Sequence, residues 1–196
     1  MKIIIQDRNL IFTQIPLQFQ HHGKVNLFSV KNNKTLAETL EDRRYSSLSI
    51  ETHRRYPNSL NKKLGDFLLE LKLNGDNYYL RFLNEHGNKV YCDFSIATTP
   101  LSKAKGVYSF IIGEDIMYFG RSHDPFEKRL NQGYGHISPK NCYRDGQSTN
   151  CHINSLIARN SSDISFHVLP LDNDLEIDRL EKQLIILYRP KWNVLF

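Results

Sequence analysis

The sequence contains few cysteines and has no long apolar segment. Its three cysteines, Cys92, Cys142 and Cys151, are an odd number and lack the spacing of a disulfide framework. We therefore expect a reducing, cytoplasmic location. No run of eighteen apolar residues exists, so no membrane span is predicted. The N-terminal stretch becomes charged too early for a secretory signal.

Acidic residues are in the minority. The chain has 26 Lys and Arg residues against 21 Asp and Glu residues, which gives a formal net charge of +5. This balance suits a polyanionic partner such as nucleic acid, although surface lysines alone would produce the same excess. Hydrophobic residues make up 40% of the 196 residues, which is enough for one large or two small packed domains.

The first hundred residues carry no recognisable catalytic constellation. Alternating apolar residues predict an antiparallel meander over residues 63–96, and a further strand is predicted over residues 25–30. Residues 35–45 have a helical pattern. The small, polar segment Thr98–Ser102 contains a proline and is the best predicted domain boundary. We thus predict an α+β, strand-rich N-terminal region over residues 1–101, for DNA binding or dimerisation, and a second domain over residues 102–196.

The stretch from Gly106 to Arg129 predicts a strand, a tight turn, a second strand and the start of a helix. If a three-residue loop centres on Gly113, Tyr108 and Tyr118 lie directly opposite each other. Their side chains then share one face of a two-stranded ribbon, because side chains alternate along a strand.

Helix signals follow the ribbon. Asp124 suits an N-cap with proline next to it, and Gly133 is expected to end this helix. A long polar loop covers residues 133–150. The last helix is predicted from about Asp174 to Tyr188, and Glu181 lies at or within its apolar stripe. A carboxylate there is costly unless it is paired or binds a cation.

This pattern resembles the GIY-YIG nuclease family. Gly106-Val107-Tyr108 corresponds to the first motif and Tyr118-Phe119-Gly120 to the second. The arginine of the family's first helix would be Arg129, its glutamate Glu181, and its following asparagine Asn193. The resemblance implies an α+β fold whose C-terminal domain has a small antiparallel sheet flanked by helices.

The resemblance also implies a chemistry. Glu181 would bind one divalent cation, with Mg²⁺ as the expected ion and Mn²⁺ as an alternative, and Arg129 would neutralise the phosphate. Tyr108 would orient or deprotonate the attacking water, and Tyr118 would help to position it. Asn193 would fix Glu181 or the substrate through hydrogen bonds.

Two positions depart from the family pattern. Many members have a His or Tyr four residues after the helix arginine, where this chain has Gly133. Tyr134 or His136 could take its place, and we favour His136 as an acid/base or phosphate contact. Arg121 stands where lysine is common and is expected to contact phosphate. The remaining predicted substrate contacts come from the polar loop and the helix after it; they are Tyr134, Lys140, Arg144 and His152.

Each residue also has a purely structural interpretation. Tyr108 and Tyr118 could be a cross-strand aromatic pair. Glu181 could be paired with a neighbouring cation, and Asn193 could be a turn residue. A zinc site is disfavoured because the spacing of its candidates matches no standard ligand pattern; these candidates are His136, Cys142, Cys151 and His152.

The sequence therefore predicts a metal-dependent DNA endonuclease, of restriction type and sequence-specific. Double-strand cleavage by one small catalytic centre would favour a homodimer. The alternatives are a non-catalytic DNA-binding or assembly module on the same scaffold, and a repair, mobile-element or RNA-directed nuclease.

Overall fold

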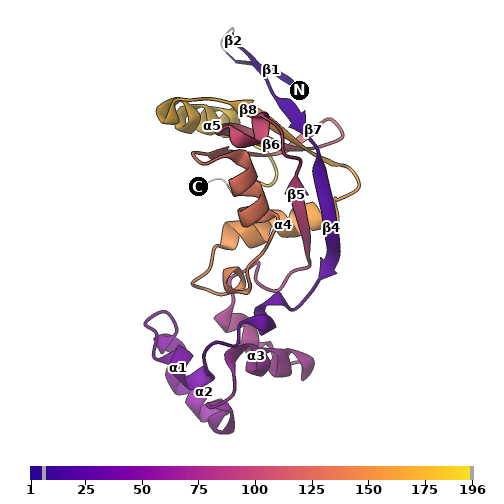
Figure 1. The fold of residues 1–196 in the computed structure, drawn as a ribbon. Helices are drawn as coiled ribbons and strands as arrows, with labels where there is room; N and C mark the ends of the chain where they lie inside the picture. The colour runs from indigo at the N-terminus through magenta and orange to yellow at the C-terminus, as the bar shows by residue number, and fades with distance from the viewer. Residues whose placement is uncertain (6–7, 195–196) are drawn as a thin grey trace. The chain divides into compact units, whose positions relative to one another are not determined.

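The chain forms two compact units (Figure 1). The computed structural model describes residues 1–5 and 8–194. The first unit comprises Met1–His22, Cys92–His136 and Leu156–Phe196, and the second comprises Gly23–Tyr91 and Ile137–Ser155. The two units are therefore not consecutive in sequence, since each is assembled from separate segments.

The predicted boundary at residues 101–102 lies inside the first unit. Strand β3 (Thr13–Ile15) pairs antiparallel with β8 (Ile164–Pro170), which joins the start of the chain to the C-terminal half. A pairing between segments so distant in sequence leaves no local signal. The role in DNA binding or dimerisation assigned to residues 1–101 stays a prediction.

A four-stranded antiparallel sheet forms the centre of the first unit. Its order is β3-β8-β6-β7, with β6 at Gly106–Ile112 and β7 at Asp115–Ser122. Helix α5 (Asp174–Tyr188) packs against β6 and β7. The predicted α+β class is thus confirmed for this unit. Apolar side chains of the sheet and the helix form its core, among them Val107, Phe119, Ile177, Leu180 and Leu184.

Smaller elements complete the first unit. The paired strands are β1 (Lys2–Ile5) with β2 (Arg8–Ile11) and β4 (Leu17–Lys24) with β5 (Tyr91–Ile96). Helix α4 (Ser148–Arg159) begins in the second unit and ends in the first. A 3₁₀ turn occupies Leu101–Lys103. Among the described residues, no helix combines the length and apolar character needed to span a bilayer.

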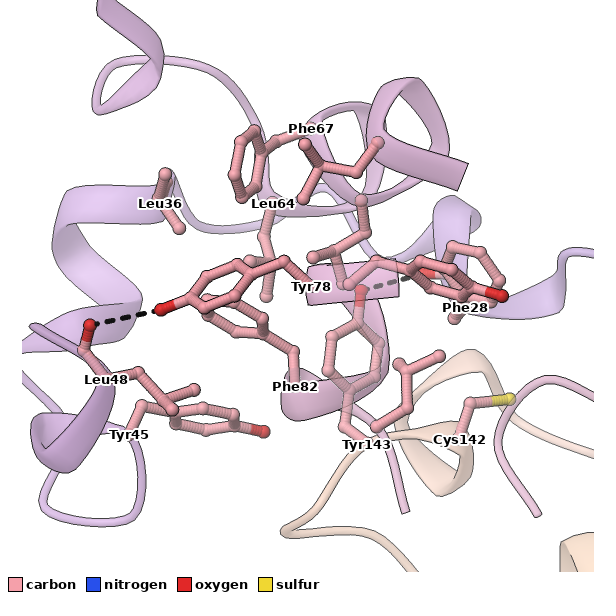
Figure 2. Close-up of a cluster of buried hydrophobic side chains, with 14 of the residues drawn as sticks. Phe28, Leu36, Tyr45, Leu48, Leu64, Phe67, Tyr78, Phe82, Cys142 and Tyr143 are labelled. Carbon is pink, nitrogen blue, oxygen red and sulfur yellow. Dashed lines mark hydrogen bonds between the residues drawn. The ribbon is translucent and has the colours of Figure 1, made fainter. Parts of the chain in front are cut away.

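The second unit contains short helices around an aromatic core (Figure 2). Tyr143 donates a hydrogen bond from its hydroxyl to the carbonyl of Phe28 at 2.8 Å, which ties the late segment to the early one. The helices are α1 (Leu36–Leu40), α2 (Ser49–Arg55) and α3 (Leu64–Leu73), with 3₁₀ turns at Leu27–Val30, Ser46–Leu48, Pro57–Ser59, Asn77–Phe82 and Pro139–Cys142.

Two predictions for this unit are wrong. The meander over residues 63–96 is replaced by α3 and a 3₁₀ turn, and only its last strand, β5, is present. In α3 the buried residues Leu64, Phe67, Leu68 and Leu71 recur at helical spacing. Phe67, Leu69, Leu71 and Leu73 also recur at a spacing of two, so the run fits both periods. The strand predicted over residues 25–30 is a 3₁₀ turn.

Gly106 tests the packing of the central strands. Its φ is +145°, and an added Cβ would lie 2.2 Å from the Leu169 carbonyl oxygen. We expect Gly106→Ala to lower the free energy of unfolding by about 3 kcal/mol or more, through overpacking and backbone strain. Gly113 is the matched control, because its φ is +58° but no atom lies within 4 Å of such a Cβ. Gly113→Ala should cost only about 1–2 kcal/mol. Equal losses in urea denaturation would contradict this interpretation.

Candidate active site

The β6–β7 ribbon positions the two motif tyrosines. Tyr108 pairs with Gly120, and Phe110 pairs with Tyr118, because the turn has two residues and the register shifts after Phe110. The tyrosines are therefore diagonal neighbours, so the prediction that they lie directly opposite is wrong. Their shared face is confirmed, with ring centroids 6.2 Å apart.

Gly120 is required by the ring of Tyr108. A Cβ at Gly120 would lie 2.5 Å from both Cζ and the hydroxyl oxygen of Tyr108. The phenol therefore lies across the space that a side chain would fill. The absence of a side chain at Gly120 thus fixes where the Tyr108 hydroxyl points.

The helix after the ribbon does not end at Gly133. It continues as a π-helical segment, Lys128–Tyr134, in which the Gly135 amide donates to the carbonyl of Leu130, five residues earlier. A π turn takes in one residue more than an α turn. It therefore brings Tyr134, five positions after Arg129, to the same side of the helix as that arginine.

The hydroxyl of Tyr134 is the hub of a buried polar cluster. It accepts a hydrogen bond from the Tyr108 hydroxyl at 3.0 Å and one from Nη2 of Arg129 at 2.7 Å. The Tyr118 hydroxyl lies 3.3 Å away. Arg129 also donates from Nε to Tyr108 at 3.4 Å, and its guanidinium lies 4.3 Å from the centroid of the Tyr134 ring. Three phenols and one cation thus form a single network.

The surroundings keep these phenols protonated. Burial raises the pKa of Tyr108 and of Tyr118 well above the usual value, and it does the same for Tyr134. The charge of Arg129 opposes these shifts without cancelling them. Burial also acts against the charge of Arg129, yet the nearby tyrosines hold its pKa above the ordinary value. The cluster therefore contains neutral hydroxyls and a charged arginine.

Glu181 lies on α5 beside Arg121 of β7. Its Oε2 is paired with Nη1 of Arg121, and its side chain is only 14% exposed. Burial raises the pKa of Glu181, and Arg121 offsets that shift only in part. After burial and Tyr108, Glu181 also contributes to the raised pKa of Tyr118, so its charge reaches the tyrosine cluster.

Arg121 is shared between two carboxylates of α5. Its Nε lies 3.0 Å from Oδ1 of Asp178, while Nη1 pairs with Glu181. His123 also reaches Asp178, with Nε2 at 2.9 Å from the same oxygen, and its Nδ1 lies 3.2 Å from Asp174. His123 and Asp178 were not among the predicted site residues. The spacing of Asp174, Asp178 and Glu181 on one helix face could have indicated Asp178, whereas His123 has no such local signal.

Asn193 holds the edge of the sheet. Its Oδ1 accepts from the Phe119 amide at 2.9 Å, and its Nδ2 donates to the Phe119 carbonyl at 2.8 Å. Next to it, the Trp192 amide donates to the carbonyl of Met117. The structure thus places Asn193 on the backbone of β7 between the two motif positions, rather than on Glu181.

The other predicted site residues lie elsewhere. His136 is 65% exposed and has Nδ1 3.4 Å from Asp93, so Tyr134 and not His136 completes the cluster. Lys140 and Arg144 are exposed in the second unit. In the same unit, the ring of His152 lies tilted against that of His86, with centroids 4.3 Å apart.

The carboxylate of Glu181, now paired with Arg121, could serve as one ligand of a hard divalent cation. Within the described ranges, no group of three or more His, Cys, Asp or Glu side chains could hold a metal. A site with one buried carboxylate suits an ion such as Mg²⁺, which keeps several waters and binds substrate oxygens. Arg121 now supplies the positive charge at this carboxylate.

Comparisons with known proteins give a limited likeness. Neither a protein-family model nor a curated protein matches the chain. Two solved structures match, both point mutants of the GIY-YIG N-terminal endonuclease domain of UvrC from Thermotoga maritima bound to a catalytic divalent cation. Their identities are 22% and 19%, with TM-scores of 0.35 and 0.32. Each match covers 49% of this chain and 89% of the UvrC domain.

Tyr134→Phe tests the hub. The change removes the oxygen that accepts from Tyr108 and Arg129, and leaves both with an unmet hydrogen bond. We expect a loss of about 1–3 kcal/mol in the free energy of unfolding. His136→Ala is the control, because that side chain is exposed, and it should change stability by less than about 0.5 kcal/mol. A larger loss for His136→Ala than for Tyr134→Phe would show that the hub is misplaced.

Glu181→Gln tests the cost of the buried carboxylate. The folded pKa of Glu181 is raised above the unfolded value of about 4.3, so its contribution to stability falls as pH rises through the folded pKa. Glutamine has no such titration. The melting temperature of Glu181→Gln relative to the native protein should therefore rise between pH 4 and pH 7. A relative melting temperature that falls over this range would reverse the sign and reject the assignment.

Proposed function

We propose that the first unit is a metal-dependent endonuclease domain of the GIY-YIG type, which hydrolyses phosphodiester bonds in DNA. The observation that carries this proposal is the convergence of Tyr108, Tyr118, Tyr134 and Arg129 on one hydroxyl hub, with the buried pair Arg121–Glu181 on the adjoining part of β7. A purely structural pair of tyrosines would not need an arginine at its hydroxyls, so the presence of Arg129 favours a functional role.

The location of these groups suits a substrate at the edge of the sheet. Tyr118 lies on one face of β7, while Arg121 lies on the other face, toward α5. Strand β7 is an edge strand of the sheet, so both faces adjoin the same border. We place the phosphate beside the part of β7 that Trp192 and Asn193 leave uncovered, where Arg129 would contact it and Glu181 would hold the cation.

Arg129 would bind the phosphate. Two of its N–H groups are held by tyrosine hydroxyls, which fixes the plane of the guanidinium. The remaining N–H groups can donate to phosphate oxygens and stabilise the charge that builds during attack. Its raised pKa keeps it charged throughout the working pH range.

Tyr118 would orient the attacking water. It is the half-buried tyrosine of the three, whereas Tyr108 and Tyr134 are fully buried. As a neutral phenol it accepts a hydrogen bond from the water, and the network behind it fixes its hydroxyl. Tyr108 and Tyr134 would act as positioning residues. Of the two roles considered for Tyr108, we therefore favour the orienting one over that of a general base.

Glu181 would hold the divalent cation. When bound, such an ion stabilises charge on phosphate oxygens and makes water easier to deprotonate. In the reaction the water oxygen bonds to phosphorus, and the bond from phosphorus to the leaving sugar oxygen breaks. The water proton passes to solvent, and the leaving oxygen takes a proton from solvent. Asn193 contributes by fixing the β7 backbone between the two motif positions.

The finer form of the proposal is a restriction-type enzyme that cuts specific duplex sites, acting as a homodimer. The second unit offers a surface besides the catalytic one, which sequence recognition needs. The net charge of +5 supports a polyanionic substrate.

Cleavage of mixed-sequence plasmid and genomic DNA tests this function. With Mg²⁺ we expect discrete fragments, and none with EDTA or with Glu181→Gln. Arg129→Lys should slow cleavage by about a hundredfold or more, because lysine cannot make the same planar contacts. A metal-dependent smear would keep the nuclease and reject the restriction type.

The control is Glu176→Gln, on the same helix at the partly exposed pair with Arg8. It should cut at the native rate, which separates a catalytic loss from a general effect on α5. Folded protein that binds DNA but never cuts it, on any substrate including RNA and single strands, would favour the non-catalytic module.

A further inference from the structure

The second unit contains a polar pocket of about 200 Å³ with a cationic lining. Lys31, Lys34, Arg44 and Lys140 contribute positive charges to it, and Asp42 and Asp145 contribute negative ones. The lining thus carries a net excess of two positive charges. A water molecule takes up about 30 Å³ of liquid, so this volume admits a phosphate-sized group with several waters.

Both carboxylates of the pocket are already engaged. Asp42 accepts from Nε and Nη2 of Arg44 at 3.2 and 3.3 Å. Asp145 accepts from the Tyr45 hydroxyl at 2.7 Å and lies 3.6 Å from Nη1 of Arg44. These contacts fix the guanidinium between two acids. They leave the lysines as the groups available to an anion.

The three lysines of the lining form no ion pair among the described residues. Over residues 1–5 and 8–194, the ion pairs reach Arg44 but not Lys31, Lys34 or Lys140. Lys31 lies instead over the ring of Tyr143, with Nζ 4.3 Å from its centroid. Burial lowers the pKa of Lys31 and outweighs the attraction of Asp145, and the neighbouring cations lower it further. Cations crowded in this way gain from a bound anion.

Two buried aromatic residues support the pocket. Tyr45, which lines it, and Tyr143, beneath Lys31, are both buried in the aromatic core of this unit (Figure 2). The ring of Tyr45 stacks on Phe82 with centroids 5.9 Å apart. Tyr45 and Lys31 are therefore held in place by the core, whereas Lys34 and Lys140 are exposed side chains of the lining. Such preorganisation lowers the entropic cost of binding.

We propose that this pocket binds a phosphate group of nucleic acid, with Lys34 and Lys140 as the principal contacts, Lys31 behind them and Arg44 fixed at the side. The ligand class rests on the proposed function, because the pocket chemistry by itself would also accept the phosphate of a free mononucleotide. The second unit then contributes affinity for the backbone, separately from the catalytic residues.

Duplex binding in EDTA tests the proposal without cleavage. The probe is a fluorescein-labelled 30-base-pair duplex, titrated with the full chain carrying Glu181→Gln and read by anisotropy over a range of salt concentrations. We compare this protein with one that also carries Lys34→Gln and Lys140→Gln. The control instead carries Arg54→Gln and Lys89→Gln, which make the same charge change in the same unit outside the pocket.

Loss of one phosphate contact should weaken binding about tenfold at 0.1 M salt and reduce the salt slope by about 0.9. The control should bind as its parent does. Equal weakening in both double variants would overturn the proposal, because it would show only the effect of net charge. Circular dichroism confirms that each variant is folded.

A second titration separates the two sources of phosphate. Inorganic phosphate and adenosine monophosphate are added to the protein, and binding is read from the NMR signals of the lysine side chains. Protection of Lys34 and Lys140 by the mononucleotide, with unchanged duplex binding in the pocket variant, would assign the pocket to free nucleotides and overturn the nucleic-acid assignment. If the native chain binds no duplex, the proposed function fails. In that case, shifts of the lysine NMR signals on adding inorganic phosphate would retain the anion site. The absence of such shifts would reject it.

Discussion

The hydrogen bonds to the Tyr134 hydroxyl are the interaction on which the candidate site depends. A buried phenol without a partner costs free energy, and here Tyr108 and Tyr134 meet that requirement through each other and through Arg129. Arg129 in turn is a half-buried cation that needs acceptors. No member of the cluster can be removed without leaving another unsatisfied, so the ribbon and the helix are fixed together at this point.

The π turn is the backbone solution to this constraint. With Gly133 four residues after Arg129, a regular α-helix would present no side chain there. Widening the helix by one residue presents Tyr134 instead, at the cost of poorer backbone geometry. π turns are frequent at functional sites, which agrees with a helix whose regularity is given up to place one hydroxyl. A purely structural aromatic cluster could be packed without that cost.

Features of the site that depend on residues close in sequence were largely predicted. Features that depend on long-range pairing were not. The apolar pattern gave the bounds of α5, and the motif residues indicated the ribbon. The exact pairing escaped because a two-residue turn and a register shift leave the same residues on the same face. Tyr134 was named only as the alternative to His136, because a π turn has no sequence signature and glycine at position 133 was interpreted as a helix end. The chain segments that make up each unit could not be predicted, because the first unit depends on β3 pairing with β8.

The edge position of β7 accounts for the role of Asn193. An edge strand exposes unpaired amides and carbonyls, and here Trp192 and Asn193 satisfy those of Met117 and Phe119. Because these contacts fix Met117 and Phe119, the backbone is held on both sides of Tyr118. Asn193 therefore acts on the strand itself rather than on Glu181. Its amide fixes the strand that carries Tyr118 on one face and Arg121 on the other, so both sides of the candidate site depend on this one edge contact.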